Sequence, residues 1–170
     1  MDSVKEITVE PVPEVTDEVR VLLGELDRIL AAEYPPEQRH GLSLDEIFNP
    51  GVRFFLARSN GAAVGCGGFA FFADFVEVKR MYVREAARGR GVARHYWREL
   101  KERRGSGLVL LRLETGARQT AALTFYRRAG FQPCAAFGAY ATMAAPAIAT
   151  SVFLETPRCR IDARQHLASA

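Results

Sequence analysis

The sequence predicts a single domain of mixed α/β class, with helices on both sides of a twisted sheet. Short runs of β-branched and aromatic residues alternate along the chain with stretches whose apolar residues recur every three to four positions. Asn60-Gly61 separates two such runs and is a strong signal for a tight β-hairpin. A third run, residues 76–83, continues through a loop rich in glycine and arginine into an amphipathic helix.

The length and composition limit the class of protein. With 170 residues, 48% of them hydrophobic, the chain can form one domain with a sizeable core. We expect this domain to span residues 1–155, followed by a flexible basic tail at residues 156–170. No apolar run reaches the roughly 20 residues that span a bilayer, and the amino end lacks a signal-peptide pattern. A soluble cytoplasmic protein without a membrane partner is therefore expected.

The first third of the chain is predicted to hold one strand and two helices. Residues 7–10 have the pattern of a strand. Thr16 is suited to cap a helix that Pro35 stops. Ser43-Leu-Asp-Glu46 has capping-box spacing, so residues 43–48 are expected to form a short second helix.

The later elements follow the hairpin. Residues 108–113 are apolar and predict a strand buried on both faces. Residues 120–129 predict an amphipathic helix that Gly130 terminates. The alanine-rich residues 139–150 are expected to form an ordered loop near the cleft. The remaining strands are expected at residues 54–57, 63–72, 134–137 and 151–155.

The loop after the third strand carries the features of an anion site. Gly89 and Gly91 permit main-chain conformations that other residues resist, and they keep side chains away from the main chain. The first N–H groups of the next helix have no internal partner and lie at the positive end of its dipole, which favours a phosphate. Arg88, Arg90 and Arg94 add positive charge. The motifs of nucleotide-hydrolysing and dinucleotide-binding loops are absent, so a diphosphate site of another kind is predicted.

Four sequence blocks resemble those of the GNAT family of N-acetyltransferases in order and approximate spacing. Arg88-x-x-Gly91-x-Ala93 is similar to the coenzyme A signature of that family. The other blocks are Glu77-Val-Lys-Arg-Met-Tyr-Val83, Leu113-Glu-Thr-Gly116 and residues 122–131. The resemblance implies the acyl-CoA N-acyltransferase fold, with a central mixed sheet of roughly six to seven strands and about four helices. It also implies an enzyme with acetyl-CoA as co-substrate, without a metal, that acetylates a primary amine by direct attack in a ternary complex.

The resemblance assigns roles to residues at matching positions. The main chain at Met81, Tyr82 and Val83 would bind the amides of coenzyme A and polarise the acetyl carbonyl, as an oxyanion hole does. Tyr126 matches the tyrosine that faces the sulfur and is the candidate acid for the departing thiolate. Gln119 stands where many relatives carry an asparagine that contacts the arm of the cofactor. The implied diphosphate site consists of Arg88, Gly89, Arg90, Gly91, Val92, Ala93 and Arg94.

The base that deprotonates the acceptor has two interpretations. Glu77 lies at the offset from the coenzyme A signature at which the histone-acetylating branch of the family carries its catalytic glutamate. Strand alternation would place it on one face with Lys79, Met81 and Val83. An ion pair between Glu77 and Lys79 or another cation is an equally good explanation. Glu114 is a weaker candidate, and many relatives pass the proton through water.

No residue identifies the acceptor. A small amine or an amino-acid-like molecule is expected, because relatives with similar blocks are mostly described as general acetyltransferases. The alternatives are a lysine or N-terminus of a protein, or a non-catalytic module that binds acyl-CoA. Nucleic acid is not expected, because the basic residues between 84 and 104 do not alternate with aromatic residues. Members of the family are often dimers, so a homodimer is a further expectation.

Overall fold

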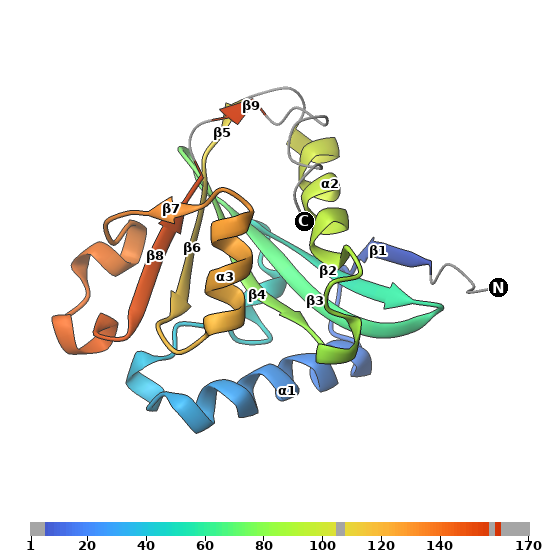
Figure 1. Ribbon diagram of the computed structural model, residues 1–170, viewed down its shortest axis with the longest axis horizontal. Coiled ribbons are helices and arrows are strands. Elements are labelled where there is room, and N and C mark those ends of the chain that lie inside the picture. Colours follow the sequence, from blue (N-terminus) through green and yellow to red (C-terminus); the bar gives the residue numbers. More distant parts are fainter. Residues whose placement is uncertain (1–5, 105–107, 157–158, 161–170) are drawn as a thin grey trace.

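The computed structural model describes residues 6–104, 108–156 and 159–160. In this part of the chain, one mixed sheet has the strand order β1-β2-β3-β4-β6-β8-β7, and β5 pairs separately with β9 (Figure 1). The strands are β1 (Ile7–Pro11), β2 (Val52–Ser59), β3 (Ala62–Phe71), β4 (Val76–Val83), β5 (Leu108–Val109), β6 (Leu111–Gly116), β7 (Gln132–Pro133), β8 (Ser151–Glu155) and β9 (Cys159–Arg160). The predicted mixed α/β class with a central sheet of six to seven strands is confirmed, and the described residues form three α-helices where about four were expected.

The described helices comprise three α-helices and several 3-10 turns. The α-helices are α1 (Asp17–Glu33), α2 (Val92–Arg104) and α3 (Thr120–Arg128). The 3-10 turns are η1 (Pro36–Gln38), η2 (Glu46–Phe48), η3 (Glu85–Ala87), η4 (Gly138–Thr142) and η5 (Ala145–Ile148). None of the described helices is long and apolar enough to cross a membrane.

β4 and β6 run parallel, whereas the other described neighbours in the main sheet are antiparallel. Their pairing is short, because residues 76–78 pair with residues 111–113 and the register extends no further. Beyond this point β4 and β6 diverge (Figure 1). The divergence leaves one edge of β4 without a strand partner along its second half.

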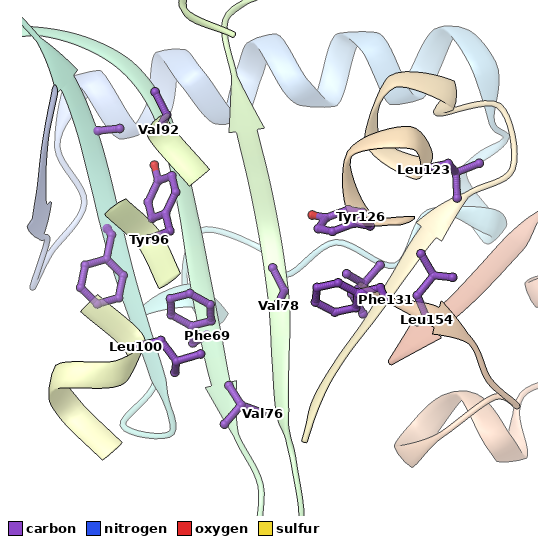
Figure 2. Packing of buried hydrophobic residues seen from close by; sticks show 13 residues of the cluster. Phe69, Val76, Val78, Val92, Tyr96, Leu100, Leu123, Tyr126, Phe131 and Leu154 are labelled. Atoms are coloured by element: carbon purple, nitrogen blue, oxygen red, sulfur yellow. The ribbon is translucent and has the colours of Figure 1, made fainter. Parts of the chain in front are cut away.

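Each face of the sheet is covered by its own core. Side chains alternate along β2, so Phe55 and Ala57 point to one side and Phe54 and Leu56 to the other. The first pair belongs to the core that contains residues of α2 and α3, such as Tyr96 (Figure 2). The second pair belongs to the core that contains residues of α1 and η2. The helices therefore lie on both sides of the sheet, as predicted.

The local signals in the sequence act as expected. The Thr16 hydroxyl accepts a hydrogen bond from the Val19 N–H at 3.3 Å and caps α1. Asn60 and Gly61 have positive φ angles of 49° and 83°, as a tight hairpin turn requires. Gly130 follows α3 with φ at 90°, in the left-handed conformation that ends a helix.

The predictions for two segments need correction. Residues 108–113 do not form one strand, because β5 pairs with β9 while β6 begins at Leu111 in the main sheet. The prediction that this segment is buried on both faces is also wrong. Leu113 lies in the core, whereas Arg112 bonds to Glu155 and Glu114 bonds to Ser151. The expected short helix at residues 43–48 is a single 3-10 turn, although the Ser43 and Glu46 hydrogen bonds of a capping box are present.

The predicted strand at residues 134–137 is wrong. Pairing with β8 occurs at β7, two residues earlier, and ends after the Cys134 N–H bonds to the Phe153 carbonyl. Phe137 instead packs against Phe75 and Phe153, which draws the chain over the face of the sheet and into η4. Of the expected tail, Cys159 and Arg160 form β9, and residues 157–158 and 161–170 lie outside the described residues.

Candidate active site

A β-bulge interrupts β4 at Arg80. Lys79 pairs with Gly68 and Tyr82 with Cys66, so Arg80 and Met81 together oppose a single residue of β3. Arg80 has φ at 54°, in the left-handed region that residues other than glycine rarely occupy. Such a conformation persists when the surrounding structure enforces it, and it is typical of functional sites.

The bulge overturns one prediction made from strand alternation. Met81 and Val83 were expected on the same face as Glu77 and Lys79. They pack instead against the core that contains Val78, Tyr96 and Tyr126. The extra residue at the bulge reverses the alternation, so the side chains after it point to the opposite face.

The edge of β4 that faces β6 is available beyond residue 78. The Arg84 N–H donates to the Val64 carbonyl of β3 at 2.9 Å. Because neighbouring residues of a strand direct their main-chain groups to opposite sides, the groups of Val83 point toward β6. The Val83 carbonyl accepts a hydrogen bond from Arg88 Nε at 3.0 Å. An extended ligand could pair with this edge as an added strand does.

The loop before α2 has the geometry of an anion site. Gly89 and Gly91 have φ angles of 74° and 81°, and a Cβ atom at either position would meet no other atom within 4 Å. The main-chain N–H groups of Arg88 and His95, on either side of this loop, donate to other main-chain carbonyls. Within the part of the chain that the structure describes, the N–H groups of residues 89–94 form no such hydrogen bond. Arg88, Arg90 and Arg94 are exposed beside these donors. The residues present therefore fit a diphosphate.

Tyr126 of α3 belongs to the core that also contains Val78 of β4 and Leu113 of β6. Figure 2 shows its ring between β4 and β6, with the hydroxyl group pointing toward β4. The residue is 6% exposed and packs edge-on against Phe131, with ring centroids 5.4 Å apart. Burial raises the pKa of Tyr126, so its phenol stays protonated at neutral pH.

Glu77 is held in a buried polar cluster on the face of the sheet that does not carry α2. Its Oε1 lies 2.9 Å from Lys79 Nζ and accepts a hydrogen bond from the Tyr140 hydroxyl at 2.8 Å. The Tyr140 hydroxyl in turn accepts one from Lys79 Nζ at 2.5 Å. The ion pair that was one of the two interpretations of Glu77 is therefore present.

Glu114 lies in β6 one residue after Leu113, the last residue of this strand that pairs with β4. Its carboxylate accepts a hydrogen bond from the Ser151 hydroxyl at 2.6 Å. Burial raises the pKa of Glu114, while that hydrogen bond and the charges of His40 and Lys79 oppose the increase. A carboxyl group with a raised pKa is suited to proton transfer near neutral pH.

Comparison with known proteins identifies the family. The model of the acetyltransferase (GNAT) domain matches residues 50–133. An Azospirillum brasilense protein named IAA acetyltransferase is 39% identical over 137 residues, which cover 79% of this chain and 90% of that protein. The chain belongs to the GNAT acetyltransferase family. As a GNAT enzyme, it is an acetyl-CoA-dependent acetyltransferase.

Solved GNAT structures share the fold. The PaiA N-acetyltransferase of Thermoplasma acidophilum, in complex with coenzyme A, matches with a TM-score of 0.63 at 15% identity, covering 89% of this chain and 98% of that chain. An IAA acetyltransferase from Bacillus cereus matches with a TM-score of 0.58 at 18% identity, covering 89% and 99% of the two chains. At these identities the similarity confirms the GNAT fold alone.

Two side chains of this GNAT enzyme make contacts that the sequence did not predict. The Gln119 amide, expected to contact the cofactor, donates to Glu33 Oε2 at 2.9 Å and ties the start of α3 to the end of α1. Tyr140, which contacts both Glu77 and Lys79, was not predicted from the sequence. One signal in the sequence could have identified Tyr140. It is the only tyrosine among the small residues of the alanine-rich segment 139–150, which was expected near the cleft.

Proposed function

We propose that this enzyme transfers the acetyl group of acetyl-CoA to the nitrogen of a small primary amine, by direct attack in a ternary complex. The observation that carries the proposal is the divergence of β4 from β6 beyond residue 78, directly before a glycine and arginine loop at a helix N-terminus. This arrangement offers an open strand edge for an extended chain of amides and a polar loop for a diphosphate.

The proposed contacts to acetyl-CoA follow from that arrangement. The open edge at Met81, Tyr82 and Val83 binds the amides of the co-substrate and polarises the acetyl carbonyl. Gln119 contributes if its amide leaves Glu33. The diphosphate is held by the N–H groups and side chains of the loop and the first turn of α2, namely Arg88, Gly89, Arg90, Gly91, Val92, Ala93 and Arg94.

The reaction forms one bond and breaks another at the same carbon. The lone pair of the neutral amine attacks the carbonyl carbon, the new C–N bond forms, and the C–S bond breaks. An ammonium acceptor loses two protons overall, of which one ends on the leaving thiol and the other in solvent. Tyr126 donates a hydrogen bond to the developing thiolate and is the candidate source of its proton. Burial keeps the phenol protonated, which supports its role as a hydrogen-bond donor to the thiolate.

Deprotonation of the acceptor is assigned to a carboxylate near the point where β4 and β6 stop pairing. The contacts support Glu114 more than Glu77, because the charge of Glu77 is already balanced by Lys79. Glu114 carries no ion pair among the described contacts, and burial raises its pKa. Glu77 then acts as a structural partner of Lys79 and Tyr140.

The proposal is tested by measuring free thiol released from acetyl-CoA with a panel of small amines, amino acids, peptides and IAA, the compound in the names of two relatives. Thiol release with small amines is expected. Heat on titration with coenzyme A without thiol release from any acceptor would indicate a binding module. Calorimetry that detects no binding of coenzyme A to folded protein would refute the proposal.

A further inference from the structure

A cavity of about 350 Å³ lies next to the bulge of β4, on the face of the sheet that carries α1. Asp27 of α1, Arg39 and Gly41 of the segment between η1 and η2, and Arg80 of β4 line it. Arg80 connects this cavity with the reaction, because its main chain directly precedes Met81, where the acetyl carbonyl is proposed to bind. A molecule bound to Arg80 would therefore contact β4 one residue before the proposed site of the acetyl carbonyl.

Two arginine side chains line the cavity, and within the described part of the chain the Nε atom of each is enclosed without a hydrogen-bond partner. The Arg80 side chain is 7% exposed, and its Nη1 donates to Asp27 Oδ1 at 2.7 Å. The Nε atoms of Arg39 and Arg80 are buried and have no hydrogen-bond partner among the described residues. Buried donors without partners are rare, because each costs free energy. Gly41 makes room for the guanidinium group, since a Cβ atom there would lie 2.6 Å from Arg80 Nη1.

The acidic residues of the cavity are already engaged. Asp27 forms the ion pair with Arg80 and is 56% exposed. Glu46 accepts a hydrogen bond from the Ser43 N–H at 2.8 Å, which caps η2. Leu30, Leu42 and Leu44 supply apolar surface. The arginine side chains therefore remain as possible partners of an anion, and the leucines form an apolar wall beside them.

We propose that Arg39 and Arg80 bind a carboxylate of the acceptor, which makes the acceptor an amino-acid-like molecule with an apolar side chain. A guanidinium group presents several N–H donors in a fixed plane and suits the two oxygens of a carboxylate. The amine of the acceptor then faces the acetyl group, and its apolar part contacts the leucines. This inference rests on the proposed function and adds the substrate class.

The test compares acceptors that differ by one carboxylate. Phenylalanine and phenethylamine are titrated by calorimetry into the protein saturated with coenzyme A, and both are assayed for thiol release from acetyl-CoA. Tighter binding of phenylalanine is expected. Arg39→Gln and Arg80→Gln should each weaken it by about 10- to 100-fold, the effect of losing a charge-assisted hydrogen bond, and leave phenethylamine nearly unchanged. Equal binding of the two compounds, or no binding of either, would overturn the inference.

Two further variants separate the carboxylate site from general damage. Arg53→Gln removes an exposed arginine that bonds to the carbonyls of Pro50 and Val52 outside the cavity, and it should leave phenylalanine binding unchanged. Asp27→Asn removes the charge that competes for Arg80, so phenylalanine should bind about threefold more tightly, a shift of less than 1 kcal/mol. Weaker binding in this variant would contradict the inference.

The binding measurement tests the carboxylate site separately from the proposed reaction. Thiol release from acetyl-CoA with phenethylamine but no preference for phenylalanine would refute the carboxylate site and retain the acetyltransferase proposal. A carboxylate preference that Arg39→Gln abolishes, without thiol release from any amine, would retain the site and refute the proposed reaction. Arg39→Gln serves as the main variant if Arg80→Gln does not fold.

Discussion

At the scale of single residues, burial has different chemical consequences for three groups of the candidate site. Burial raises the pKa of the Tyr126 phenol and of the Glu114 carboxyl, so both groups bind their protons more tightly. Glu77 is equally enclosed but has a cation beside it. A phenol and two carboxylates on neighbouring strands and a helix therefore differ in their expected response to substitution.

Tyr126→Phe should lower kcat by about 100-fold, because the thiolate loses its hydrogen-bond donor, while the dissociation constant of coenzyme A stays unchanged. Phenylalanine keeps the ring contact with Phe131. Single-turnover thiol release and calorimetry measure the two quantities. An unaltered kcat would remove Tyr126 from the mechanism.

Glu77→Gln should destabilise the fold by about 3 kcal/mol, because it leaves the buried ammonium of Lys79 without its counter-charge. Glu10→Gln is the matched control. Glu10 also pairs with an arginine, Arg58, but is 50% exposed, so its loss should cost less than about 1 kcal/mol. Urea unfolding measures both. Similar values for the two variants would show that the Glu77 pair contributes no more than a surface pair.

Glu114→Gln should change the dependence of stability on pH. Because burial raises the folded-state pKa of Glu114 above its usual 4.5, the contribution of this group to stability is complete below that value and is lost as pH rises through the folded-state pKa. The variant should therefore match the wild type near about pH 4 and exceed it near about pH 8. Thermal unfolding across this range provides the measurement, and a difference that does not change with pH would contradict the expectation.

At the scale of secondary-structure elements, the main feature is the β4-loop-α2 unit. Most of it could be predicted from sequence, because β-branched residues, paired glycines and a helical apolar pattern act locally. The reversal of faces after Arg80 could not, since the bulge arises from pairing with β3 and leaves no mark in the pattern of β4 itself. The contacts of Tyr140 escaped prediction for a similar reason: they join η4 to β4 across 61 and 63 positions of chain.

Gly89→Ala should weaken binding of coenzyme A by about tenfold, corresponding to 1.4 kcal/mol. The expected cause is conformational, because Gly89 has φ at 74° and open space around it. Strain at a positive φ should also cost about 1 kcal/mol of stability. Gly51→Ala is the control, since its added methyl group likewise meets open space but no positive φ is recorded. Calorimetry on both variants would detect the difference, and equal affinities would argue against a role for the loop conformation.

At the scale of the whole molecule, the topology brings distant segments together around the diverging strands. The segment at η1 contacts η5 through two hydrogen bonds. Gln38 Nε2 donates to the Pro146 carbonyl at 3.2 Å, and His40 Nε2 lies 2.9 Å from the Ala147 carbonyl. The segment that follows α1 and the segment that precedes β8 therefore stabilise each other. Neither hydrophobic pattern nor motif predicted this pairing, because it depends on side chain to main chain contacts between irregular segments.

Coenzyme A should stabilise the whole protein, since it is expected to bind the folded chain alone. At a concentration 100 times its dissociation constant, the gain should be about 2.7 kcal/mol. Thermal unfolding at several concentrations measures it. A melting temperature that does not rise with ligand would be inconsistent with the proposed site.

The short register between β4 and β6 has a mechanical consequence. The sheet consists of two leaves, one formed by β1 to β4 and the other by β6, β8 and β7, and three residue pairs join them. Because this ladder is short, we expect the two leaves to separate more easily from each other than the strands within each antiparallel leaf do. A ligand bound between β4 and β6 should oppose this separation. Opening of the two strands to release the free thiol would then be the slowest step of the catalytic cycle.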